Sequence, residues 1–188
     1  MELALFPLSA HVLPGGRLTL RIFERRYIRM VKEAAQHETG FGICMFNNRA
    51  NEADNEHILA IGTLVDIIDF EPLEEGLLGI TVKGEELFQV QHVETHSDGL
   101  RTGICELLPV PKCVVEDAII EHLAHNLKQL FEKYPEVGSL YDKPQFDDPL
   151  WLLYRWMELL PLNAEQKQYW IHPENLHEAF LYLNDLIE

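Results

Sequence analysis

The sequence predicts an α+β fold, with strands in the first part of the chain and helices in the second. Up to about residue 110, apolar residues alternate with polar ones, as is typical of half-buried strands. Beyond the segment "LLPVPKC" they recur at helical spacing. The two prolines of that segment can continue neither a central strand nor a helix interior. We therefore expect a strand subdomain over residues 1–111 and a helical subdomain over residues 112–188 packed on it.

The first part of the chain contains short strand candidates separated by turn signals. They lie at residues 3–6, 18–22, 41–46, 58–70, 77–82, 87–93 and 100–108. The "LPGG" segment predicts a tight turn between the first two, because glycine accepts positive φ angles, and we expect a hairpin there. Many short strands favour a small barrel or a sandwich, since closure protects edge strands. One helix is expected over residues 25–36, where Ile28, Val31 and Ala35 have helical spacing.

The second part of the chain predicts a helical bundle. The segments with helical spacing are residues 114–133, 150–160 and 176–187. Asp148 is a capping residue and Pro149 is pre-set for a first helical position, so the middle helix is expected to begin there. In "LPLNAEQ", Asn163 and Gln166 have the spacing of a capping box, which predicts one more short helix.

The composition predicts a cytoplasmic protein. No stretch approaches the roughly 18 uninterrupted apolar residues of a membrane helix. The start "MELALFPLSAH" has Glu2 where a secretory leader carries basic residues. The three cysteines, Cys44, Cys105 and Cys113, are odd in number and too widely spaced for CxxC chemistry. We expect buried, inert thiols in a reducing compartment, with no membrane anchor, disulfide framework or zinc ribbon.

The charge is strongly acidic, with one basic segment. The formal net charge is −16, which opposes sequence-independent binding to nucleic acid. Fifteen residues are Lys or Arg, and six of them fall between positions 17 and 32. They are Arg17, Arg21, Arg25, Arg26, Arg29 and Lys32. This segment is the part of the sequence best suited to an acidic or extended ligand.

No motif predicts a catalytic centre or a cofactor. Neither GxxxxGK[ST] nor GxGxxG occurs, so a P-loop ATPase and a dinucleotide site are excluded. Ser9, Ser97 and Ser139 have no nucleophile-elbow frame. Paired carboxylates such as Asp147 with Asp148 stand beside turn or helix-start signals, where solvated charge is the simpler interpretation.

The histidines do not predict a metal site. His92 and His96 lie too far apart on an extended segment to share one ion without a fold-back. His122 and His125 have ligand-competent helical spacing, but neither pair has a Cys or a further partner at metal spacing. A solvated or capping role is the favoured interpretation for both pairs.

Several blocks of the sequence resemble one known family. "LFPLSAHVLPGGRLTLRIFERRYIRMV" resembles the opening of the Lon protease N-terminal domain family, and Phe41-Gly42, "IGTLVDI" and "ELLPLNAEQKQ" resemble its later blocks in the same order. The resemblance covers essentially the whole chain. One strand pair departs from the pattern, because "EEGLLGITVKGEELF" keeps Gly76, Gly84 and Phe88 but has Leu87 where the family usually has arginine. A role tied to that arginine is therefore not carried over.

The resemblance implies a PUA-like small barrel followed by helices, the part of a Lon-type protease that contacts protein substrates. It further implies a stand-alone, non-catalytic recognition module for unfolded or extended polypeptide, acting with a separate protease or ATPase. The proposed polypeptide-binding residues are Arg17, Arg21, Glu24, Arg25, Arg29 and Lys32. Where a strand becomes a helix, Glu24 and Arg26 are expected to form an ion pair.

Two alternatives stay open. The first is an RNA-binding module, since PUA-like barrels elsewhere bind RNA; the basic segment favours it and the charge of −16 opposes it. The second is an enzyme with a small-molecule pocket, and only the histidines, such as His122 and His125, support this hypothesis. A binding module, with no cofactor and no metal, is the preferred hypothesis.

Overall fold

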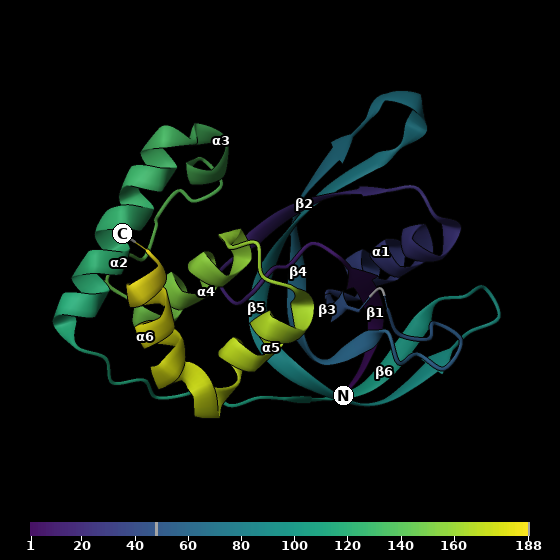
Figure 1. Cartoon of the computed structure of the whole chain (residues 1–188). Coiled ribbons are helices and arrows are strands. Elements are labelled where there is room, and N and C mark those ends of the chain that lie inside the picture. The colour runs from purple at the N-terminus through teal and green to yellow at the C-terminus, as the bar shows by residue number, and fades with distance from the viewer. Residues whose placement is uncertain (48, 188) are drawn as a thin grey trace. The chain divides into compact units, whose positions relative to one another are not determined.

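The structure is a computed structural model that describes residues 1–47 and 49–187. The chain divides into two compact units, Met1–Pro109 and Val110–Glu188. The first holds a six-stranded mixed sheet and one α-helix, and the second is helical, so the fold is α+β (Figure 1). In the described part of the chain, no helix has both the length and the apolar character needed to cross a membrane.

The strands of the first unit pair in the order β2-β5-β4-β3-β1-β6, and β5 also pairs with β6. The elements are β1 (Glu2–Leu8), β2 (Arg17–Ile22), α1 (Arg25–His37), β3 (Phe41–Phe46), β4 (Ile58–Pro72), a 3₁₀ turn η1 (Glu74–Gly76), β5 (Leu78–Thr95) and β6 (Arg101–Leu107). β1 is parallel to β3, and the other pairs are antiparallel. The β5–β6 pairing closes a circuit of five strands, with β2 added at one side of β5.

Two expectations about these strands are wrong. β1 and β2 do not form a hairpin, because β1 pairs with β3 and β6 whereas β2 pairs with β5. The predicted turn between them is nevertheless present, and Gly15 has φ 77° there. The candidates at 77–82 and 87–93 are one continuous strand, β5, in which Gly84 breaks the apolar pattern without ending the strand. Leu87, at the position of the missing arginine, is buried in this strand.

A small apolar cluster inside the circuit is built around one aromatic ring. Phe88 is fully buried on β5 and packs with Leu5 and with two thiols, Cys44 and Cys105. Gly42 on β3 makes room for the ring, because a Cβ there would lie 2.6 Å from Phe88 Cζ. A larger residue at that position would have to displace a side chain that is enclosed on all sides.

The second unit consists of α2 (Asp117–Lys133), α3 (Pro135–Gly138), α4 (Pro149–Leu159), α5 (Ala164–Ile171), a 3₁₀ turn η2 (Pro173–Asn175) and α6 (Leu176–Leu186). Its predicted caps are confirmed: Asp148 accepts a hydrogen bond from the Trp151 N–H, and Asn163 with Gln166 forms a complete capping box. α2 contacts α3, α4 and α6. The buried Trp156 donates its indole N–H to Leu123 O at 3.2 Å, which ties α4 to α2.

The fit between Gly42 and Phe88 gives the first testable prediction. We expect Gly42→Ala to lower the free energy of unfolding by about 1–3 kcal/mol, because the added methyl group overpacks the core. Phe88→Leu in the same chain should restore part of the loss, since it frees the space that the methyl group needs. Urea unfolding of the two single variants and the double variant measures this coupling. Additive effects of the two substitutions would contradict it.

Candidate functional site

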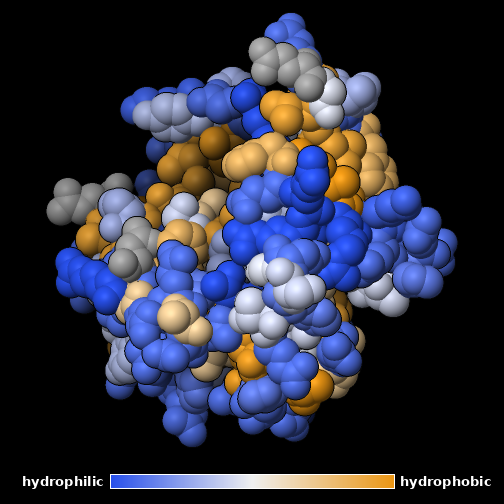
Figure 2. Space-filling model, turned by 90° about the vertical axis from the view of Figure 1, so that its right-hand side faces the viewer, coloured by the Kyte–Doolittle hydropathy of each residue, from blue (hydrophilic) through white to orange (hydrophobic). Residues whose placement is uncertain are grey.

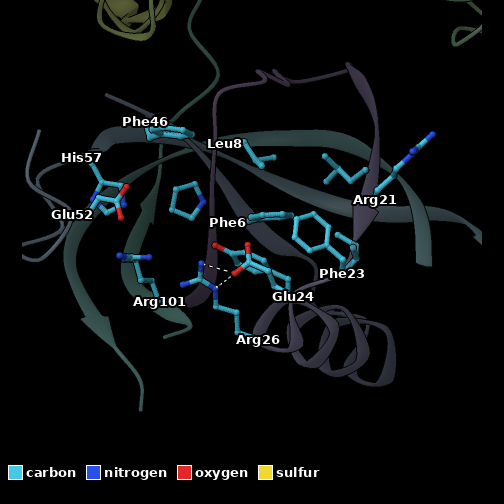
Figure 3. Close-up of a pocket in the computed structure, with 14 residues that line it drawn as sticks. Phe6, Leu8, Arg21, Phe23, Glu24, Arg26, Phe46, Glu52, His57 and Arg101 are labelled. Carbon is cyan, nitrogen blue, oxygen red and sulfur yellow. Dashed lines mark hydrogen bonds and ion pairs between the residues drawn. The ribbon is translucent and has the colours of Figure 1, made fainter. Parts of the chain in front are cut away.

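A pocket of about 290 Å³ opens in the first unit, between the end of β1 and the end of β2. Its walls come from these two strands, the start of α1, the end of β3, the loop between β3 and β4, and the start of β6. Figure 3 shows Glu52, His57 and Arg101 gathered at one end of it, and Phe6, Phe23 and Arg21 toward the other. The Glu24–Arg26 pair lies between the two groups.

One end of the pocket is aromatic. Phe6 and Tyr27 are buried and their ring centroids lie 4.0 Å apart, so they form a fixed wall. Burial raises the pKa of the Tyr27 hydroxyl, and the nearby Arg26 guanidinium partly offsets this. Phe23, by contrast, is 67% exposed at the rim. Such exposure of a large aromatic side chain is costly in water and favours a ligand that covers it.

The face of the molecule drawn in Figure 2 is mostly hydrophilic, and hydrophobic residues gather on it in several places. In the first unit, the exposed large apolar side chains beyond Phe23 include Ile28, Ile68 and Phe70. These three do not line the pocket, which makes them suitable for control substitutions.

The middle of the pocket is held by a charge-assisted clamp. Arg26 donates from Nε to Glu24 Oε2 at 2.9 Å and from NH1 to the Gly99 carbonyl at 2.9 Å. A second guanidinium nitrogen lies 2.8 Å from the same Glu24 oxygen. The predicted Glu24–Arg26 ion pair is therefore confirmed, and it ties the start of α1 to the β5–β6 turn. Gly99 has φ 83° in that turn, a conformation that favours glycine.

The other end of the pocket is polar. Arg101 donates from Nε to Asn55 Oδ1 at 2.7 Å, and the described residues include no carboxylate in an ion pair with it. Asn55 has φ 60°, and its side chain also exchanges hydrogen bonds with Thr95. This framework fixes the Arg101 guanidinium while leaving its terminal nitrogens available.

His57 is buried at the same end. Its side chain is 5% exposed, and its Nδ1 has no hydrogen-bond partner among residues 1–47 and 49–187. The ring also makes a hydrogen bond to the Asn51 backbone, and burial together with the Arg101 charge lowers the pKa of the imidazole. A buried polar nitrogen without a partner is uncommon in native proteins and indicates a missing ligand or water.

Two backbone edges beside the pocket have no strand partner in the described part of the chain. β2 pairs only with β5, and the Gly84 N–H donates to Gly16 O in the same ladder. Since hydrogen-bonded positions alternate in antiparallel strands, Thr19 and Arg21 direct their N–H and C=O groups away from β5. This edge offers both donors and acceptors to an added strand.

The free edge of β1 is different. Met1 and Cys105 exchange both of their backbone hydrogen bonds at 2.8 Å, so alternate residues of β1 face β6 as far as Leu5. By the same alternation, the backbone of Pro7 faces the side on which β6 would lie if it were longer. The Pro7 carbonyl therefore points toward the edge of β1 that has no strand partner in the described residues. Because proline has no N–H, this stretch offers an acceptor without a donor.

The six residues predicted from the basic segment lie at different places in the first unit. Arg21 and Glu24 line the pocket. Arg29 is held by ion pairs to Asp98 at 2.9 Å and Glu33 at 3.3 Å, in a different hollow. The remaining three, Arg17, Arg25 and Lys32, line none of the hollows described for this unit.

Other lining residues lie outside the segment to which sequence reasoning pointed. Phe46, Glu52, His57 and Arg101 come from 20 to 80 residues further along the chain. One signal was available for two of them: the loop "NNRANEADNEH" is rich in Asn and Asp directly after a strand, and binding residues concentrate on such loops. Arg101 gave no sequence signal.

The remaining candidates for chemistry have structural surroundings. Cys44 and Cys105 are buried, as predicted, and burial raises the pKa of both thiols, that of Cys105 to about 11. His122 donates to Ile187 O at 2.6 Å, at the end of α6. His125 contacts Gln129 at 2.9 Å. Among the described residues no three His, Cys, Asp or Glu side chains are grouped to hold a metal ion.

Comparison with known proteins identifies relatives of this chain. A family model described as the ATP-dependent protease La (LON) substrate-binding domain matches residues 2–178. Lon protease 2 of Syntrophobacter fumaroxidans is 28% identical over 175 residues, which cover 89% of this chain and 22% of that protein. Protein cereblon of Gallus gallus is 30% identical over 111 residues, which cover 55% of this chain and 24% of that protein. The chain spans less than a quarter of the length of these curated relatives.

Solved structures share the fold. The crystal structure of a Lon N-terminal domain protein from Xanthomonas campestris has a TM-score of 0.75 and 26% identity, with coverage of 100% of this chain and 99% of that one. The N-terminal domain of a Mycobacterium avium complex Lon protease has a TM-score of 0.61 and 16% identity, with coverage of 98% and 97%. At 16% identity, the second likeness is one of fold alone.

The clamp at the centre of the pocket gives the second prediction. Arg26→Lys should cost about 1 kcal/mol of unfolding free energy, because one ammonium group cannot keep the paired contact with Glu24 and the bond to Gly99 O together. Glu24→Gln should cost about 0.5 kcal/mol or less, since the amide oxygen still accepts and the pair is partly exposed. Chemical unfolding of both variants measures the order, and a larger loss for Glu24→Gln would contradict this account of the clamp.

Proposed function

Since this chain belongs to the family of ATP-dependent protease La (LON) substrate-binding domains, we propose that it is a non-catalytic module that binds unfolded or extended polypeptide. It presents such chains to a separate ATP-dependent protease. The observation that carries this proposal is the pocket beside β2, which combines a free strand edge with an exposed aromatic rim. The absence of nucleotide-binding and nucleophile motifs from the sequence supports binding as the activity of these residues.

In the proposed complex, an extended segment adds to β2 as a further strand. The N–H and C=O groups of Thr19 and Arg21 supply the hydrogen bonds, which are the same for any sequence. An apolar side chain of the segment enters the pocket and covers Phe23 against Phe6. Only unfolded or flexible chains present both features at once, because folded proteins keep their backbone groups paired.

We further propose that the closed circuit of strand pairings is the small PUA-like barrel and that the helices of the second unit form a bundle. The β5–β6 pairing supports the first assignment, and the contacts of α2 with α4 and α6 support the second. The domain division at residues 1–111 and 112–188 is proposed on the same grounds. Binding is assigned to the first of these domains.

The aromatic rim gives the third prediction. Reduced and carboxymethylated ribonuclease, which stays unfolded, should bind the full chain, and native ribonuclease should not. Phe23→Ser should weaken this binding about tenfold, the equivalent of ~1.4 kcal/mol. Phe70→Ser is the matched control, because Phe70 is 49% exposed on the same unit but outside the pocket. Fluorescence anisotropy measures the binding of both ribonucleases to the unsubstituted chain and to each of the two variants.

Three outcomes would contradict the proposal: equal binding of folded and unfolded ribonuclease, equal effects of the two substitutions, or tighter binding of an RNA hairpin than of unfolded ribonuclease. The RNA arm is titrated with salt, because phosphate binding falls steeply as salt rises.

The strand edge gives the fourth prediction. A short peptide of alternating valine and threonine that binds the chain should lose at least tenfold in affinity when alternate backbone amides are N-methylated, because the added methyl groups block pairing with β2. Methylation of the other alternate set, which faces away from β2, should have little effect. Isothermal titration compares the two peptides, which have the same composition. Equal affinities would rule out strand addition.

A further inference from the structure

We propose that the polar end of the pocket binds the C-terminal carboxylate of a polypeptide, with Arg101 as its principal ligand. This inference deepens the proposed function and rests on it. It adds that the module distinguishes the end of a chain from its interior.

The strand register supports a chain end rather than a continuing chain. β6 occupies one edge of β1 over Glu2–Leu5, and its first residue, Arg101, lies opposite Leu5. β3 occupies the other edge through Leu8. A segment laid against the free stretch from Phe6 to Leu8 and antiparallel to β1 would run in line with β6. Its C-terminal end would point at Arg101, and it could extend no further without displacing β6.

The chemistry of this end matches a carboxylate. Nε of Arg101 is taken by Asn55, so the two terminal nitrogens of the guanidinium are left for a planar, two-oxygen ligand. The other guanidinium beside it, that of Arg26, already has both of its faces occupied by Glu24 and Gly99. At this end of the pocket, Arg101 is therefore a cation for which the described residues provide no ion pair.

His57 and Pro7 supply the remaining contacts. The buried Nδ1 of His57 lacks a partner among the described residues, and imidazole can either donate or accept a hydrogen bond there. A C-terminal residue carries both a carboxylate and a backbone N–H. The Pro7 carbonyl offers an acceptor for an N–H without requiring anything in return, which suits a single terminal residue better than a long paired strand.

Glu52 sets a limit on the affinity. It lines the same end and is exposed, so its negative charge opposes a ligand carboxylate. A substitution of Glu52 should therefore change the affinity for a carboxylate in the opposite direction to a substitution of Arg101. Removing the Glu52 charge should strengthen binding of a carboxylate and leave binding of an uncharged end unchanged.

The test uses three peptides built on one octapeptide that ends in phenylalanine and has no acidic side chain, each labelled at the N-terminus: a free acid, a C-terminal carboxamide, and a carboxamide extended by Asp-Gly, whose only carboxylate is not at the chain end. The free acid should bind the full chain about tenfold more tightly than either of the others. Arg101→Gln should abolish this difference, and Glu52→Gln should increase it. Arg25→Gln removes an exposed guanidinium that lies outside the pocket and should leave the ratio unchanged. Thermal unfolding confirms that each variant is folded.

The outcomes separate the two proposals. Equal binding of the acid and the carboxamide would overturn the terminal-carboxylate site and leave polypeptide binding standing. Equal binding of the acid and the carboxamide extended by Asp-Gly, with the plain carboxamide weaker, would assign the site to carboxylates that are not at a chain end and also overturn the inference. Failure of all three peptides, together with failure of unfolded ribonuclease, would overturn both proposals. If Arg101→Gln does not fold, the Glu52→Gln ratio decides alone.

Discussion

The first unit depends on one strand, β5, that must pair with three others. Over 18 residues it gives one edge to β4 and divides the other edge between β2 and β6. A strand of this length follows a closed circuit only if it bends, and register shifts in its ladders with β4 and β6 provide the bends. Phe88, near the change from β2 to β6, fills the inside of the bend, and Gly42 gives its ring the space. This division of β5 leaves room for the pocket. β2 pairs with the first part of β5 and β6 with the last part, and neither strand covers the end of β1.

The two free edges that this topology leaves are unequal, and the inequality assigns them different roles. An unpaired strand edge is a risk in any soluble protein, because it can pair with other copies. Pro7 protects the β1 edge by removing its donor, whereas β2 keeps both donors and acceptors. β2 is short, and arginines with exposed or partly exposed side chains stand along it. Charges of one sign along an edge disfavour pairing between two copies of an edge and remain compatible with an acidic or neutral segment.

Local signals in the sequence predicted the elements well and the pairing poorly. Periodicity and caps depend on neighbours, so the bounds of α1 and β3 and the caps at Asp148 and Asn163 could be derived from the sequence. The prediction of a hairpin was wrong because strand pairing depends on residues far apart in the sequence. β2 pairs with residues about 60 positions further along the chain. The ion pair of Arg29 could not be predicted for the same reason, since its partner Asp98 is 69 residues away. Arg101 could not be predicted from the sequence, because a lone arginine at a strand start has no pattern until the fold places it opposite Leu5 of β1.

Under the proposed function, the two ends of the pocket meet opposite requirements. Backbone pairing at β2 is tolerant of sequence, and so it recognises any extended chain but discriminates weakly among them. Discrimination then has to come from a feature that is rare on folded proteins and present once per chain. A C-terminal carboxylate is such a feature, and a partly buried guanidinium beside the buried imidazole of His57 presents a small site that can bind it. In a chain with a net charge of −16, several cations, such as Arg26 and Arg29, are paired with nearby carboxylates. A guanidinium whose Nε is bonded to a neutral amide therefore keeps its attraction for an incoming anion, and the uncharged Asn55 matters as much to the site as Arg101 itself.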